Sequence, residues 1–239
     1  MGDQAVVVFL NGPCGDVTQV NNLSPNANEF GERSARLVGG TVGAAAIKTL
    51  VTAEPGDLGP TAAASEVLRI PRRKPSPERV ARCTELAKKD PAQCDRTEWT
   101  FAKEIVMLDA LIAKEPVLDV EAQAIQVGPA VYLANPAEYF CQYGLDIKAG
   151  SPFAYTCPVE LANGCVGYVP TEEALGPHGG GYETRLTAYS NLEVTAGTQI
   201  AEACVYLARA LTPGAVPEPP KIDKPRGPWG YGSVAPELD

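Results

Sequence analysis

The residues with the clearest potential for chemistry are one carboxylate, two phenols and one hydroxyl, which are spread widely along the chain. Glu138 follows a short apolar strand and the tripeptide Asn-Pro-Ala, Tyr168 lies in a second short strand, and Tyr182 follows three consecutive glycines. Thr18 closes a Gly-Asp-Val-Thr turn after an apolar run. Layered α/β folds place reactive groups in the loops at strand ends, so these four side chains are the candidates for a catalytic or metal-binding site.

Each of the four also has a purely structural explanation. A Glu in the first turn of a helix complements the helix dipole, which would account for Glu138. Tyr168 has the properties of a packed strand aromatic whose hydroxyl is hydrogen-bonded. Tyr182 is also explained as an exposed aromatic on a glycine-rich loop, and Thr18 as part of a capped turn. Residue types and spacing alone leave both explanations open.

Taken together, four segments resemble the neutral (alkaline, non-lysosomal) ceramidases, which are zinc-dependent amidases that hydrolyse N-acylsphingosine. They are a Tyr-Val pair shortly before a helix, a Gly-Gly-Gly-Tyr-Glu-Thr cluster, an Asn-Pro-Ala-Glu segment and the Gly-Asp-Val-Thr turn, at residues 163–171, 179–184, 135–138 and 15–18. The resemblance runs from about residue 6 to about residue 211, and residues 127–184 match best.

The resemblance implies a role for each candidate. The family supplies a carboxylate zinc ligand from a Pro-Gly-Glu segment, where this chain has Glu138 preceded by Ala137. Tyr168 stands at the place of a tyrosine that gives its phenol to the zinc, and Tyr182 at that of a tyrosine that assists at the scissile amide. Thr18 replaces the serine nucleophile of a Gly-Asp-Val-Ser-Pro-Asn signature, with no following Pro and one extra residue. A zinc-bound water is the alternative nucleophile.

Histidine content sets the expectation for activity. The chain has one histidine, His178, which lies in the loop before Tyr182. The family keeps its metal histidines in a part that precedes Val6 in the family order, so the resemblance implies the later part of a catalytic domain without its N-terminal zinc-histidine part. A catalytic zinc site usually has at least three protein ligands. We therefore expect the chain alone to bind zinc weakly and to lack amidase activity.

Two functions from different classes remain open at this point. One is a truncated or divergent ceramidase-like amidohydrolase, which acts on a ceramide-like or another small amide when its site is complete. The other is a non-catalytic remnant, or one half of a split enzyme that needs a partner chain with the histidines. Exposed sheet edges around residues 6–10 would then be the pairing surface.

Hydrophobic patterning predicts a layered domain of mixed strands and helices. Residues 6–10 form a continuous apolar run, which is typical of a strand covered on both faces. The pattern predicts further strands over 118–124, 130–133, 153–160 and 166–169, and helices over 30–50, 75–89, 97–114, 137–143 and 198–211. The helix over 30–50 is expected to bury its apolar side. This mixture indicates an α/β or α+β domain, a mixed sheet with flanking helices, lacking its N-terminal part.

Composition sets further limits. Residues 213–239 are rich in proline and poor in aliphatic side chains, so we expect a disordered tail after a domain at 1–212. The net charge of −9 argues against a nucleic-acid partner, and the basic cluster in residues 69–79 is expected to be a solvated loop. No apolar run is long enough for a transmembrane helix. The first residues do not match a signal peptide, which makes the cytoplasm the default expectation.

Cysteine spacing leaves the redox state open. Of seven cysteines, Cys83 and Cys94 flank one turn, and Cys157 and Cys165 flank another. Each pair would be able to form a disulfide in an oxidising compartment, and free thiols are the alternative. No pair has the two-residue spacing of a zinc ribbon.

Overall fold

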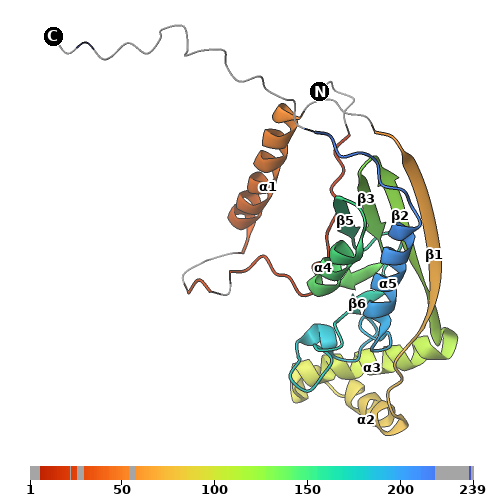
Figure 1. Cartoon of the computed structure of the whole chain (residues 1–239). Helices are drawn as coiled ribbons and strands as arrows, with labels where there is room; N and C mark the ends of the chain where they lie inside the picture. The colour runs from red at the N-terminus through yellow and green to blue at the C-terminus, as the bar shows by residue number, and fades with distance from the viewer. Residues whose placement is uncertain (1–5, 22, 26–29, 54–57, 219–236, 238–239) are drawn as a thin grey trace.

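The centre of the molecule is a four-stranded mixed sheet with the order β1-β2-β3-β5 (Figure 1). The computed structural model describes residues 6–21, 23–25, 30–53, 58–218 and 237. Strands β1 (Thr61–Pro71) and β2 (Val117–Val127) pair antiparallel, β3 (Ala130–Ala134) is antiparallel to β2, and β5 (Tyr155–Val159) is parallel to β3. The predicted fold class, a mixed sheet with flanking helices, is confirmed.

Helices pack on one face and at one end of this sheet. Helix α5 (Ala196–Arg209) lies across β1, β2 and β3, and α4 (Cys141–Gly150) packs against α5 and β5 (Figure 1). Helices α2 (Pro77–Ala87) and α3 (Arg96–Lys114) pack on each other, and the short 3-10 helix η1 (Pro91–Gln93) joins them. The predicted helices over 75–89, 97–114 and 198–211 are thus present with shifts of a few residues.

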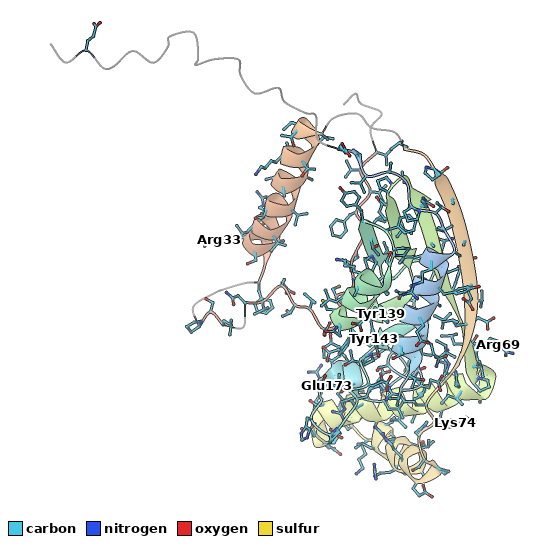
Figure 2. The ribbon with its side chains drawn as sticks, in the orientation of Figure 1. Arg33, Arg69, Lys74, Tyr139, Tyr143 and Glu173 are labelled. Atoms are coloured by element: carbon cyan, nitrogen blue, oxygen red, sulfur yellow. The ribbon has the colours of Figure 1, made fainter. Side chains whose placement is uncertain are left out.

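The core forms where the apolar face of β2 meets α5. Val120, Ala122 and Ala124 alternate along β2 and are fully buried, in agreement with the strand predicted over 118–124. Tyr139 and Tyr143 stack beside this layer with ring centroids 4.8 Å apart (Figure 2). Small residues on the buried side of α5 allow the helix to approach these rings closely.

The helix predicted over 137–143 is wrong in its first half. Residues 137–139 form strand β4 (Ala137–Tyr139), which pairs in parallel with β6 (Gly167–Val169), and α4 begins only at Cys141. The Cys141 N–H donates to the Asp16 carboxylate at 2.7 Å, so a distant segment caps the helix. A local pattern does not reveal that cap. Glu138 is therefore a strand residue, and the helix-dipole explanation for it fails.

The N-terminal predictions fail in a related way. Residues 6–10 are extended but join no strand ladder, and the exposed fractions of Val7 and Phe9 are 91% and 77%. Helix α1 (Glu32–Thr52) forms where predicted, yet none of its residues is buried. Apolar patterning predicts that a face is covered, and it does not say which segment covers it. Strand β1 was missed because its Ala-rich sequence carries a weak strand signal.

Three smaller expectations can also be compared with the structure. Residues 213–218 are the first part of the predicted tail, and the Gly214 N–H donates to the Gly128 carbonyl at 3.1 Å. Most of the remaining tail lies outside the described residues. All seven cysteines are free in the structure, which corresponds to the second of the two alternatives that their spacing left open. Among the described segments, no helix has both the length and the apolar character to cross a bilayer.

Candidate functional site

Strands β4 and β6 place Glu138 and Tyr168 side by side. The two residues are Cα partners in the parallel pair, between the partners Ala137 and Gly167 and the partners Tyr139 and Val169. Directly opposed residues of neighbouring strands project from the same face of a sheet. Side chains that are 30 positions apart in sequence therefore point the same way, as the resemblance requires of two ligands to one metal.

Tyr182 joins this pair through its hydroxyl. The 3-10 helix η2 (Tyr182–Thr184) brings the Tyr182 hydroxyl to 2.9 Å from the Tyr168 hydroxyl. The two rings meet edge to face, with centroids 5.4 Å apart and planes at 89°. Tyr189, which sequence reasoning missed, adds a third ring with its centroid 6.2 Å from that of Tyr168.

A glycine makes the Tyr189 contact possible. The Tyr168 N–H donates to the Tyr189 carbonyl at 2.7 Å, so the backbones of β6 and the 187–190 turn touch. Gly167 has a positive φ of 82°, and a Cβ there would overlap the Tyr189 carbonyl group. Only glycine combines this backbone conformation with so close an approach.

The local environment holds Tyr168 in its protonated form. Burial raises the pKa of its hydroxyl well above the ordinary value of a tyrosine, and the hydrogen bond to Tyr182 raises that pKa further. The Glu138 carboxylate acts in the same direction, both as a hydrogen-bond partner and through its negative charge. The Tyr168 phenol is thus a proton donor in this structure, and it faces a carboxylate.

Glu138 also lines a cavity of about 490 Å³ beside the tyrosines. Tyr189 and Arg72 contribute to its wall, together with Glu115, which follows α3, and carboxylates of β2. The Arg72 side chain is 6% exposed and lies 3.0 Å from the Glu115 carboxylate and 2.6 Å from the Asn191 amide oxygen. The expectation of a solvated basic loop is therefore wrong for Arg72, because an ion pair and a buried amide hold it at the cavity.

The turn that carries the Thr18 motif lies against β4. The Gly15 N–H donates to the Tyr139 carbonyl at 2.9 Å, and a Cβ on Gly15 would lie 2.6 Å from the Glu138 carbonyl oxygen. Thr18 itself is exposed, and its hydroxyl bonds within its own turn to Gln19 and to the Val20 N–H. Among the described residues, no hydrogen bond connects Thr18 with Glu138, Tyr168 or Tyr182.

The donors do not by themselves fit a catalytic zinc ion. Glu138 and Tyr168 offer two oxygens, and the described residues contain no cluster of three His, Cys, Asp or Glu side chains. His178 is exposed in the glycine-rich loop. A catalytic zinc usually takes three protein ligands, so this part of the chain supplies fewer donors than the ion needs.

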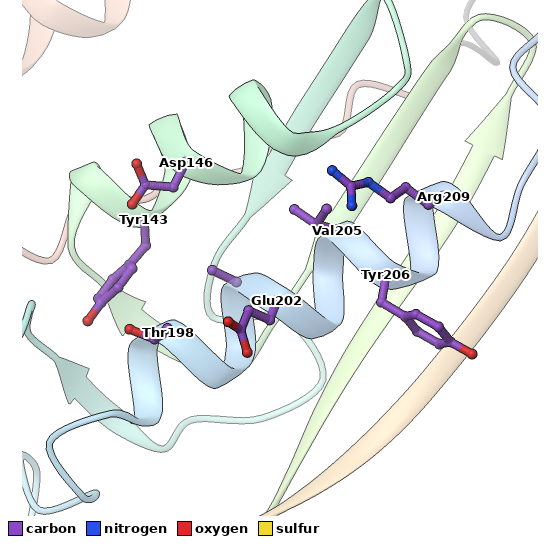
Figure 3. A pocket seen from close by; sticks show the side chains of 8 residues that line it. Tyr143, Asp146, Thr198, Glu202, Val205, Tyr206 and Arg209 are labelled. Carbon is purple, nitrogen blue, oxygen red and sulfur yellow. The ribbon is translucent and has the colours of Figure 1, made fainter.

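A second depression lies elsewhere, between α4 and α5, and has a volume of about 400 Å³ (Figure 3). Tyr143 and Asp146 of α4 line it, together with Thr198, Glu202 and Tyr206 of α5. None of the residues that carry the ceramidase resemblance lines this groove.

Comparison with known proteins supports the fold. The crystal structure of the neutral ceramidase from Pseudomonas aeruginosa superposes with a TM-score of 0.50 and 17% identity, over 82% of this chain and 37% of that chain. A structure of a ceramidase complexed with C2 gives a TM-score of 0.49 and 15% identity, over 81% and 38%. No family model and no curated protein matches the sequence. The chain thus has a ceramidase-like fold and spans little more than a third of the Pseudomonas chain.

Proposed function

We propose that this chain carries one part of the active site of a ceramidase-like amide hydrolase. The observation that carries the proposal is the meeting of Glu138, Tyr168 and Tyr182 on the β4–β6 pair. These are the positions that the family motifs pick out, and the likeness in fold to a neutral ceramidase supports the same reading.

Each side chain has a role in this proposal that its chemistry allows. Glu138 and Tyr168 would supply two oxygen donors to a zinc ion whose other ligands would come from a histidine-bearing segment supplied in cis or in trans. The Tyr182 hydroxyl donates a hydrogen bond to the amide carbonyl, whose oxygen gains negative charge as the bond is attacked. Thr18 is the residue that the family motif proposes as the nucleophile. Its hydroxyl has no basic partner among its hydrogen bonds, so that role depends on a base from elsewhere.

Zinc content and amide hydrolysis test this proposal. We expect the isolated chain to hold less than one equivalent of zinc and to leave a short-chain ceramide and a fluorogenic N-acyl amide intact. Joined in cis or in trans to a histidine-bearing segment from its own source, it should bind zinc and hydrolyse an N-acyl amide. In that complete protein Glu138→Ala should abolish both properties, and Tyr182→Phe should lower kcat by about 10²-fold with zinc retained.

The control is Glu173→Ala, which removes an exposed carboxylate away from the β4–β6 pair. Two results would contradict the proposal. One is a complete protein that keeps zinc and activity after Glu138→Ala. The other is near-stoichiometric zinc in the isolated chain that Glu138→Ala removes, since that would mean that a third ligand lies within this chain.

The exposed N-terminal run favours a second candidate function, that of one half of a split enzyme. Residues 6–10 are all apolar, and their exposed fractions range from 50% to 91%. Glu160 follows β5, which is an edge strand of the sheet, and its N–H donates to the Asn11 carbonyl at 3.0 Å. The run of residues 6–10 therefore leads directly to the end of β5. An apolar segment beside a sheet edge is suited to pairing with a strand of another body. In this reading the partner is the part of a ceramidase-like fold that the chain does not contain.

Charge substitutions in this run separate the two candidates. Val7→Lys combined with Phe9→Lys should leave the melting temperature of the isolated chain unchanged, because both side chains already face solvent. The same pair should prevent association with the histidine-bearing segment supplied in trans. Val17→Lys, at a residue that is 57% exposed outside the run, is the control. Unimpaired association of the double variant would exclude residues 6–10 as the pairing surface.

A further inference from the structure

Glu160 is a buried carboxylate that no sequence motif singles out. It follows β5 and is 3% exposed. Burying a carboxylate is costly unless hydrogen bonds replace its lost hydration. No ion pair with Glu160 occurs among the described residues, so neutral donors must satisfy its charge.

Four donors from two distant segments converge on this carboxylate. Oε2 accepts hydrogen bonds from the Tyr139 N–H at 2.8 Å and from the Cys14 N–H at 3.1 Å. Oε1 accepts from the Asn11 side-chain amide at 2.9 Å and from the Cys14 thiol at 2.8 Å. Glu160 thus connects the N-terminal turn to the residue that follows Glu138 in β4.

The thiol in this cluster acts as a donor and is poorly suited to be a nucleophile. Burial raises the pKa of Cys14, and its hydrogen bond to Glu160 acts in the same direction. A protonated thiol can donate to a carboxylate, whereas nucleophilic attack needs the thiolate. Cys14 therefore helps to attach the turn to Glu160.

Two further contacts define what Glu160 holds in place. Gly15 packs its backbone on the Glu138 carbonyl, and the Asp16 carboxylate caps α4 through the Cys141 N–H. Without the carboxylate, the turn would keep the cap, the backbone hydrogen bond from Gly15 to β4 and the backbone hydrogen bond from the Glu160 N–H to the Asn11 carbonyl, and it would lose every side-chain contact to Glu160.

We infer that Glu160 is the positioning residue that fixes the turn at residues 11–16 against the strand that carries Glu138. A role for Glu160 in catalysis rests on the proposed function, because only in that function do the turn and Glu138 take part in one reaction. The attachment itself involves only contacts within this chain and can be measured without any activity.

Hydrogen exchange on the whole chain, read by mass spectrometry, tests the inference with three variants. Glu160→Met removes both acceptor oxygens at similar side-chain length. Asn11→Asp places a second carboxylate against the first. Each should speed the exchange of the peptide at residues 11–18 by at least about tenfold, because buried N–H groups lose their acceptor or like charges repel. Exchange in α5 should not change.

The third variant combines Asn11→Asp with Glu160→Gln and acts as a rescue. The new amide group donates to the new carboxylate, and its oxygen still accepts from the Cys14 and Tyr139 N–H groups. Exchange of residues 11–18 should return to within about threefold of the wild-type rate. Glu173→Gln is the control, since it makes the same chemical change at an exposed position.

The outcomes are separable. If Glu160→Met leaves the exchange of residues 11–18 unchanged, or if Glu160→Gln does not rescue Asn11→Asp, Glu160 does not hold the turn. Should Glu160→Met fail to fold, the rescue pair decides alone. In the complete enzyme, Glu160→Met should lower kcat and leave zinc content unchanged. A complete protein without amidase activity would count against the proposed function and leave the exchange result standing.

Discussion

Gly167→Ala should destabilise the protein strongly, because the methyl group has no room. The new Cβ would fall on the Tyr189 carbonyl, with the Tyr189 carbonyl carbon 2.7 Å away, and φ at this residue is +82°. A left-handed backbone costs a non-glycine residue about 1 kcal/mol. Overpacking a rigid contact costs about 1–3 kcal/mol. Moving the two backbones apart breaks the hydrogen bond from the Tyr168 N–H to Tyr189, which contributes about 1 kcal/mol.

We therefore expect a loss of about 3–5 kcal/mol in the free energy of unfolding, which lowers Tm by about 10 °C in a domain of this size. Urea titration followed by circular dichroism measures the loss. Gly164→Ala is the matched control, since Gly164 lies in the loop that precedes β6 and a Cβ there would lie 3.5 Å from the Pro136 Cβ. The control should change stability by about 0.5 kcal/mol or less. Equal stability of the two variants would refute the close approach of β6 to Tyr189.

Two further predictions concern titration and reactivity. The raised pKa of Tyr168 means that the folded state binds this proton more tightly than the unfolded state does, so its contribution is complete below about pH 10 and falls above it. Urea titrations between pH 8 and pH 11 give the free energy of unfolding of wild type relative to Tyr168→Phe. This difference should decline above pH 10 by up to about 1.4 kcal/mol per pH unit. A difference that rises with pH would mean that the pKa of Tyr168 is lowered by folding. Among the thiols, Cys165 is exposed, while burial raises the pKa of Cys204 to about 12. Iodoacetamide should label Cys165 first and Cys204 only after unfolding, and equal labelling of the two in the folded protein would contradict the buried position of Cys204.

The periodicity of apolar residues predicted the strands and helices whose buried face is evident from residues close together in the sequence. Strand β2 alternates apolar and polar side chains, and α3 has an apolar stripe with Asp95 as its N-cap, so both are readable from sequence. Strand β1 carries no such signal, because a run of alanines favours a helix over a strand. Its eleven residues are extended because β2 pairs with all of them. The paired residues lie 46 to 66 positions apart in the sequence, which is too far for a local window to detect.

The candidate site likewise contains residues that were identified from the sequence and residues that only the structure revealed. Motif resemblance picked out Glu138, Tyr168 and Tyr182, and the fold brings these three together. Tyr189 and Arg72 could not have been found in this way, because their importance comes from contacts with β6 and with Glu115. A residue type in a turn or a basic cluster gives no sign of such partners.

Residue types, local periods and the glycines that allow close backbone approach are properties of the sequence alone. They predicted most helices and the mixed sheet, and the family resemblance added three residues of the candidate site. The position of Glu138 in a strand, the exposure of residues 6–10 and the attachment of the N-terminal turn by Glu160 emerged only in the folded chain. All three have the same physical cause. Burial and hydrogen-bond satisfaction depend on which distant segment supplies the partner, and a local pattern states only that a partner is needed.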